Sequence, residues 1–172
     1  MGKHTTTSCD PPKSLSEHRR NNRLSLDLYL GRRIYFITIN TAGKNPVFIA
    51  DAVVSHHLKI LSSASSAHCF DVIAYCYMPD HVHLLIAGRK QASDLIAFIK
   101  AYKQTTGYRF KQAVGDVLWQ KSYYDHILRK DEDVREVVRY ILANPLRKGM
   151  VERPAAYPYA GSLVYGPDIF QI

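Results

Sequence analysis

The stretch MPDHVHLLI, residues 78–86, organises the interpretation of the whole chain. It predicts a short loop that leads into a β-strand. Because side chains on a strand alternate between two faces, His81 and His83 are expected on one face, and the aliphatic residues 82, 84 and 86 on the other. Two imidazoles on one face can bind a single metal ion, and the aliphatic face can pack against helices.

The composition is that of an ordinary globular domain. The chain has 172 residues, of which 47% are hydrophobic and 22% charged, so it can form a sizeable core and is not typical of a disordered protein. No apolar run approaches the roughly 20 residues that a membrane span needs. The N-terminal segment lacks the apolar core of a signal peptide. We therefore expect a cytoplasmic protein.

The charge of the chain favours a polyanionic partner. The formal net charge is +8 and the isoelectric point is about 9.4. Nucleic acid is the commonest such partner, and a basic protein without one is the alternative. The cysteines Cys9, Cys69 and Cys76 have no C-x-x-C spacing, so they are expected to be reduced thiols and not zinc ligands.

Hydrophobic periodicity predicts seven main elements. The hairpin is predicted from two apolar strands that are separated only by Pro79-Asp80. Ser93 is the expected N-cap of the second helix, and Pro145 limits the third. In chain order we expect a strand at 34–40, a helix from 51 that ends within 62–67, strands at 72–77 and 81–87, a helix at 94–112, a strand at 119–128 and a helix at 131–144.

The first six elements follow the order β-α-β-β-α-β, which is that of the ferredoxin-like split fold. The expected class is therefore α+β, with a four-stranded antiparallel sheet and two helices on one face. The other face is left for a third, tyrosine-bearing helix or a substrate. Residues 1–23 are expected to form a basic, flexible arm, and residues 24–172 a single domain whose tail is irregular from about 150.

The third helix carries two candidate site residues. Tyr140 and Asn144 are four residues apart, so they share a helix face along one edge of the apolar stripe. A phenol beside a bound metal can act as a nucleophile on a phosphate, and an amide oxygen can be a third, hard ligand. The alternatives are an ordinary core-edge tyrosine and a helix-capping asparagine before Pro145.

Three segments in this order, MPDHVHLL, LWQKSYYDHILR and VVRYILANPLRKGMV, resemble the single-tyrosine HUH transposases. Within that group they are most similar to the REP-associated tyrosine transposases, and the resemblance covers roughly residues 24–160. It implies the ferredoxin-like fold reached above. It also implies that His81, His83 and Asn144 bind a divalent metal, Mg²⁺ or Mn²⁺, and that Tyr140 is the nucleophile.

The activity that the resemblance implies is cleavage of single-stranded DNA and strand transfer through a 5′-phosphotyrosine, which is a route to DNA transposition and recombination. The expected partner is single-stranded or hairpin-forming repeat DNA, and the expected location is the cytoplasm in association with the nucleoid. The oligomeric state is left open between monomer and homodimer.

Members of the family near REP elements use an N-terminal tract, an aromatic residue followed by Pro-Gly, to contact DNA. This chain has Tyr29-Leu30-Gly31, with leucine in place of proline. Basic side chains are expected to contact phosphates. The predicted DNA-binding residues are Arg23, Tyr29, Arg32, Arg33, Lys100, Lys103, Arg109 and Lys121.

Other readings compete with this one. A non-catalytic protein that retains the fold and binds DNA hairpins is the main alternative. A metal hydrolase of another class is less favoured, because the nearest acid is Asp80 in the preceding loop. Replication initiators often carry two tyrosines on the catalytic helix, whereas Tyr140 stands alone. Tyr123 and Tyr124 are rival nucleophiles, more simply explained by packing or base stacking, and His126 is expected in a supporting role.

Overall fold

The computed structural model of the chain describes residues 25–171, and the expected arm at residues 1–23 lies outside them. Its centre is an antiparallel sheet in the order β4-β1-β3-β2-β5. The strands are β1 (Ile34–Asn40), β2 (Phe70–Met78), β3 (His81–Gly88), β4 (Tyr124–Ile127) and β5 (Ala160–Gly161).

The sheet has five strands and not the expected four. The fifth is a two-residue strand from the C-terminal tail, where an irregular segment was expected, and it pairs Ala160 with Cys76 and Gly161 with Tyr75. Two residues carry too little periodicity to be visible as a strand. The strand forms because the tail meets the free edge of β2.

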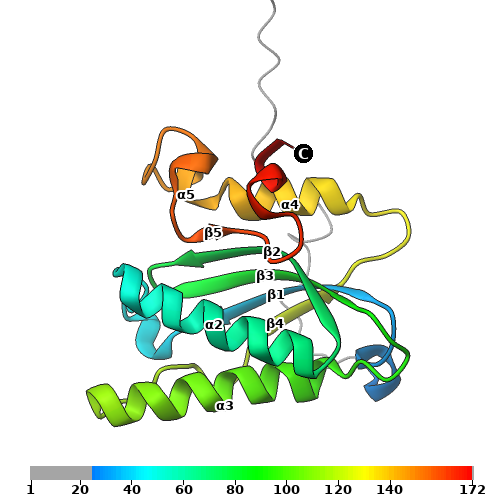
Figure 1. The fold of residues 1–172 in the computed structure, drawn as a ribbon, viewed down its shortest axis with the longest axis horizontal. Coiled ribbons are helices and arrows are strands. Elements are labelled where there is room, and N and C mark those ends of the chain that lie inside the picture. Colours follow the sequence, from blue (N-terminus) through cyan, green and yellow to red (C-terminus); the bar gives the residue numbers. More distant parts are fainter. Residues whose placement is uncertain (1–24, 172) are drawn as a thin grey trace, which may run out of the picture.

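The helices lie on both faces of the sheet. Figure 1 shows α2 (Asp51–Ala67) and α3 (Leu95–Val114) on one face and α4 (Val134–Leu142) on the other. The short helix α5 (Asn144–Arg147) follows α4. This arrangement confirms the α+β class and the place of the tyrosine-bearing helix. The 3-10 turns are η1 (Leu26–Tyr29), η2 (Ala42–Lys44), η3 (Pro154–Ala156) and η4 (Gly166–Gln171).

Some element ends differ from the expected ones. The cap of α3 is Asp94, whose carboxylate accepts a hydrogen bond from the Ala97 amide at 3.0 Å. Ser93 does not cap the helix because its hydroxyl donates to the Cys69 carbonyl at 2.8 Å. The strand expected at 119–128 is limited to β4, and Trp119 only forms an isolated bridge with Thr41.

The central strand β3 separates two hydrophobic cores. Its residues Val82, Leu84 and Ile86 are 0% exposed and belong to the core under α2 and α3. Leu85 belongs to the second core, under α4. The predicted alternation of faces is therefore confirmed, and the histidine side of β3 is the side that α4 covers. Within residues 25–171, no helix is long and apolar enough to span a membrane.

A pair of buried hydroxyl groups links the sheet to α3 in the first core. The Tyr77 and Tyr102 hydroxyl oxygens are 2.9 Å apart, and both side chains are fully buried. One hydroxyl donates to the other, so each has a hydrogen-bond partner in a region that water does not reach.

We expect Tyr102→Phe to lower the free energy of unfolding by about 1–3 kcal/mol, because the Tyr77 hydroxyl would stay buried without its partner. The double variant Tyr77→Phe/Tyr102→Phe should lose clearly less than the sum of the two single variants. Urea unfolding followed by circular dichroism measures all three. Additive losses would show that the two hydroxyls do not interact.

Candidate active site

The histidine pair lies at the start of the central strand β3. In the sheet register His81 faces Asn40 of β1 and Met78 of β2, and His83 faces Thr38 and Cys76. Neighbouring strands on both sides fix the backbone of the pair. The His83 side chain is only 7% exposed and stacks on Phe36 of the second core.

The two imidazole rings present the same nitrogen to one another. The Nε2 atoms of His81 and His83 are 3.1 Å apart. The Nδ1 atoms are engaged elsewhere, with the Asp80 carboxylate at 2.6 Å and with the Thr38 hydroxyl at 2.8 Å. A carboxylate only accepts hydrogen bonds, so His81 donates its Nδ1–H to Asp80 and keeps a lone pair on Nε2.

This geometry fits a shared metal ion. Two nitrogen ligands at about 2.1 Å from one ion, at angles between 90° and tetrahedral, lie about 3.0–3.4 Å apart. A ligating histidine commonly donates its other ring N–H to a carboxylate or a similar acceptor, which orients the ring. Asp80 provides that acceptor for His81, and Thr38 occupies the matching position for His83.

Burial keeps both imidazoles in the neutral form that binds metals. Burial lowers the pKa of His83 well below its ordinary value, and the nearby His81 and the Arg147 charge act in the same direction. Burial also lowers the pKa of His81, although its hydrogen bond to Asp80 opposes that shift. Lone pairs on the ring nitrogens are therefore available near neutral pH.

Within residues 25–171, a third protein ligand beside the histidine pair would be of another residue type. Among the residues that the structure describes, no three His, Cys, Asp or Glu side chains form a metal-binding cluster. Asn144 is buried, and its Nδ2 donates to the carbonyls of Tyr140 at 2.8 Å and Ile141 at 3.3 Å. Since carbonyls accept hydrogen bonds, Nδ2 must face them, which leaves Oδ1 as the candidate ligand atom.

Tyr140 lies directly beside the histidine pair. Its ring centroid is 6.2 Å from that of His83 and 6.0 Å from that of Phe36, which itself stacks on His83 at 5.5 Å. Phe36 on β1 therefore supports both rings. The side chain is half-buried, at the edge of the second core, so the predicted position at the edge of the apolar stripe is the observed one.

Three cations surround the site, and sequence reasoning did not single them out. The guanidinium of Arg147 lies over the Tyr140 ring, 5.0 Å from its centroid, and its charge lowers the pKa of His83. The charges of Lys44 and Lys148 lower the pKa of His81. Arg147 follows Tyr140 by seven residues, or two helical turns. This spacing could have identified Arg147 as a candidate from the sequence.

The structure gives structural roles to other candidates. His126 contacts the Glu132 carboxylate through Nε2 at 2.9 Å, which links β4 to the segment before α4 and agrees with a supporting role. The ring of Tyr123 lies 5.7 Å from the Lys103 amine. Tyr124 packs edge-on against Phe36, and its buried hydroxyl has no hydrogen-bond partner within residues 25–171.

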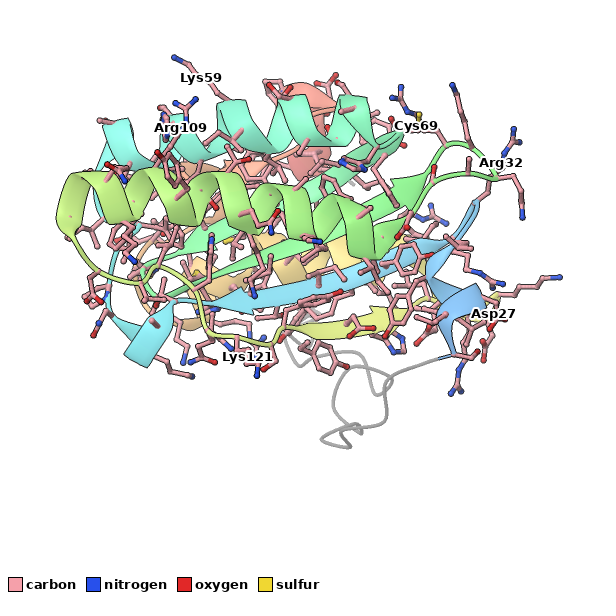
Figure 2. All side chains as sticks on the ribbon, turned by 90° about the horizontal axis from the view of Figure 1, so that it is seen from below. Asp27, Arg32, Lys59, Cys69, Arg109 and Lys121 are labelled. Atoms are coloured by element: carbon pink, nitrogen blue, oxygen red, sulfur yellow. The ribbon has the colours of Figure 1, made fainter. Side chains whose placement is uncertain are left out.

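The predicted DNA-binding residues do not form one surface. Arg23 lies outside the described residues, and Tyr29 is 4% exposed in the first core, so its ring offers no stacking surface. The Lys103 amine donates to the carbonyls of Gln120 and Lys121. Figure 2 shows Arg32 at one end of the molecule and Arg109 toward the other. The exposed residues of the set are Arg32, Arg33, Lys100, Arg109 and Lys121.

Comparison with protein families finds one matching model, which is described as "Transposase IS200 like" and covers residues 32–144. This range includes the histidine pair, Tyr140 and Asn144. The match extends over well over half of the chain.

Individual proteins agree with this match. An Escherichia coli (strain K12) protein named as a REP-associated tyrosine transposase is 22% identical over 147 residues, which are 85% of this chain and 82% of the relative. A Haemophilus influenzae protein that its name assigns provisionally to the same transposases is 25% identical over 139 residues. The aligned part is 74% of this chain and 78% of the relative. A solved REP-associated tyrosine transposase bound to a REP hairpin shares the fold, with a TM-score of 0.66 and 20% identity over 83% of this chain and 82% of that one.

We expect Tyr124→Phe to raise the free energy of unfolding by about 1 kcal/mol, because it removes a buried hydroxyl that lacks a partner. Tyr157→Phe is the matched control. Its hydroxyl donates to the Tyr77 carbonyl at 2.7 Å, so its removal should destabilise the protein by a similar amount. Urea unfolding midpoints compare the two. A loss of stability in Tyr124→Phe would show that this hydroxyl has a partner in solution.

Proposed function

Because the chain belongs to the family of IS200-like transposases, we propose that it cleaves and rejoins single-stranded DNA through a covalent 5′-phosphotyrosine on Tyr140. The substrate class is single-stranded DNA that carries a hairpin. Two relatives named for REP-associated tyrosine transposases, and a solved structure of the same fold that is bound to a REP hairpin, support hairpin-forming repeat DNA in particular.

The observation that carries the proposal is the position of the Tyr140 ring beside His83, which is one of two converging imidazoles. The Tyr140 ring lies 6.2 Å from the His83 ring, whose Nε2 faces the Nε2 of His81 at 3.1 Å. Nucleophilic catalysis at a phosphate needs an attacking oxygen next to a group that withdraws charge from the phosphate. Tyr140 can supply the attacking oxygen, and the two imidazoles can bind the cation that would withdraw charge, so this arrangement supports the proposal.

His81, His83 and Asn144 are the residues that would hold a divalent metal, with Mg²⁺ or Mn²⁺ as the proposed ion. When bound, the ion supplies a Lewis acid that polarises the scissile phosphate. The protein contributes the preorganisation: Asp80 and Thr38 orient the two imidazoles, and the Tyr140 carbonyl orients the Asn144 amide. Groups held in this way would lose less freedom on binding an ion.

Tyr140 performs the covalent step. Its phenolic oxygen attacks the phosphorus and loses its proton, the bond from phosphorus to the 3′ oxygen breaks, and that oxygen leaves as a hydroxyl after it takes up a proton. The product is a 5′-phosphotyrosine. In the reverse direction a 3′-hydroxyl attacks the same phosphorus and releases Tyr140. One phosphodiester is exchanged for another, so strands can be joined without an energy source.

Arg147 is the residue best placed to stabilise the charge of this step. Its guanidinium lies over the Tyr140 ring at 5.0 Å, where it can pair with a phosphate oxygen and with the negative charge that develops on the phenol. Arginine suits this role because its planar fork matches a phosphate. Lys148 and Lys44, whose charges reach His81, add attraction for the DNA backbone.

We expect purified protein to form a covalent adduct with labelled single-stranded hairpin oligonucleotides in the presence of Mg²⁺ or Mn²⁺, visible as a shifted band on a denaturing gel. Tyr140→Phe should abolish the adduct because it removes the attacking oxygen. Tyr123→Phe and Tyr124→Phe are the controls and should retain it. The oligonucleotides should come from repeats that flank the gene.

The controls decide between the competing readings. An adduct that survives Tyr140→Phe and disappears in Tyr123→Phe or Tyr124→Phe would move the nucleophile to β4 or the residue before it. Hairpin binding with no adduct under either metal would refute the enzyme and favour a non-catalytic hairpin-binding protein.

We expect Arg147→Gln to slow adduct formation by about tenfold or more, because a charge-assisted hydrogen bond to phosphate is worth about 1.5–3 kcal/mol. Arg153→Gln, at an exposed arginine six residues further along, is the matched control and should react like the wild type. Single-turnover rates at saturating DNA measure both. Equal rates for the two variants would remove Arg147 from the mechanism.

A further inference from the structure

A groove of about 360 Å³ lies between α3 and the loop that follows it, away from the histidine pair. One wall is the C-terminal half of α3, and the other is the segment 116–121. Its size is within the range of sites that bind small ligands, about 300–1,000 Å³. Nothing in the proposed chemistry at Tyr140 uses this groove.

The groove combines apolar surface with positive charge. Tyr108 and Val117 are unusually exposed for their type, at 67% and 60%, and they flank a floor that includes Trp119. The Trp119 ring is held in place because its Nε1 donates to the Thr106 hydroxyl at 2.8 Å. Three lysines line the groove against a single acid, Asp116, and they are Lys103, Lys111 and Lys121.

The lysines have different functions in the groove. The Lys103 amine is already bound to the carbonyls of Gln120 at 2.8 Å and Lys121 at 3.2 Å, so it holds the two walls together. Lys111 and Lys121 are exposed, which leaves them able to meet a phosphate. Figure 2 shows Lys121 on the loop that returns from α3 toward β4.

The groove lies at the same end of the sheet as His81. Its wall is hydrogen-bonded to the end of β1, through Gln120 to the Asn40 carbonyl at 3.0 Å and from Ala42 to the Leu118 carbonyl at 2.8 Å. Asn40 is also the partner of His81 across the sheet. Two strand spacings of about 4.8 Å, or about 10 Å, separate the backbone of this wall from that of β3. The groove lies on the α3 side of the sheet and the histidine rings on the α4 side, so a strand that contacts both passes around the edge of the sheet.

We propose that this groove binds an unpaired nucleotide of the DNA strand whose scissile phosphate lies at the histidine pair. The base lies against Tyr108, Val117 and Trp119, and the adjoining phosphate contacts Lys111 or Lys121. The inference rests on the proposed function, because it takes its substrate to be single-stranded DNA.

An unpaired nucleotide fits these features better than duplex DNA. In a duplex, neighbouring bases cover the faces of each base, and only its edges and the phosphates are reachable. A single strand offers the face of a base, which stacks on aromatic side chains, while lysines follow the backbone. The groove presents an exposed tyrosine, an apolar floor and free lysines within one site.

The probe for the test is fluorescein-labelled dT12, with one thymine replaced by 5-iodouracil for photo-crosslinking. We expect wild-type protein to bind dT12 and to crosslink at the groove, on peptides that contain Tyr108 or Trp119. Tyr108→Ala should weaken dT12 binding at least about fivefold, because stacking of a base on an aromatic ring is lost. Lys121→Gln should lower the slope of log affinity against log salt by about 0.7.

Matched controls are Tyr165→Ala and Lys59→Gln. Tyr165 is 51% exposed near the C-terminus, and Lys59 projects from α2 on the side of Figure 2 opposite Lys121. Both should bind dT12 like the wild type.

The proposal is overturned if wild-type protein does not bind dT12, if Tyr108→Ala binds it as tightly as Tyr165→Ala, or if the crosslinks map to other segments. Failure of the proposed function would appear separately, as the absence of any covalent adduct with wild-type protein.

Discussion

The alternation of side chains along β3 is the constraint on which the rest of the structure depends. With Val82, Leu84 and Ile86 buried under α2 and α3, the side chains of His81 and His83 must point to the opposite face. A shift of one residue in register would reverse every one of these positions. The pairing of β3 with β1 on one side and β2 on the other prevents such a shift. The geometry of the histidine pair is thus a consequence of how the first core packs.

The second face of the sheet is built around the pair. Burial of Val137, Val138 and Ile141 holds α4 against β2 and β3, and the edge of its apolar stripe places Tyr140 beside His83. Phe36 fills the space between the sheet and the phenol. The following helix α5 ends at Arg147, and Lys148 comes next in the chain. The charge of Arg147 acts on His83 and that of Lys148 on His81. The site therefore combines neutral imidazoles, held neutral by burial, with exposed positive charge at its rim, an arrangement suited to a polyanionic substrate.

The regular elements were predictable because their periodicity is strong. The alternation in 81–87 and the apolar spacing in 134–142 gave the strand, the helix and their faces, and the fold class is confirmed. The fifth strand was missed because two residues have no period. His57 of α2 is 4% exposed among Phe48, Tyr77 and Trp119, and these partners come from distant segments that the periodicity of one helix does not identify. The chemical roles of Tyr140, Asn144 and the two histidines stay predictions.

By itself, the sequence determined the order of the elements, the face on which the histidines lie, the spacing of Tyr140 and Asn144, and the family to which the chain belongs. These depend on local periodicity and on motifs within single segments. Only the tertiary structure decided which side chains meet: that Asp80 and Thr38 orient the histidines, that Arg147 covers the Tyr140 ring, and that Tyr29 is buried. The physical reason is that contacts between distant segments are set by how the sheet and its two helical layers pack, and the sequence of one segment does not specify the surface that another will bury.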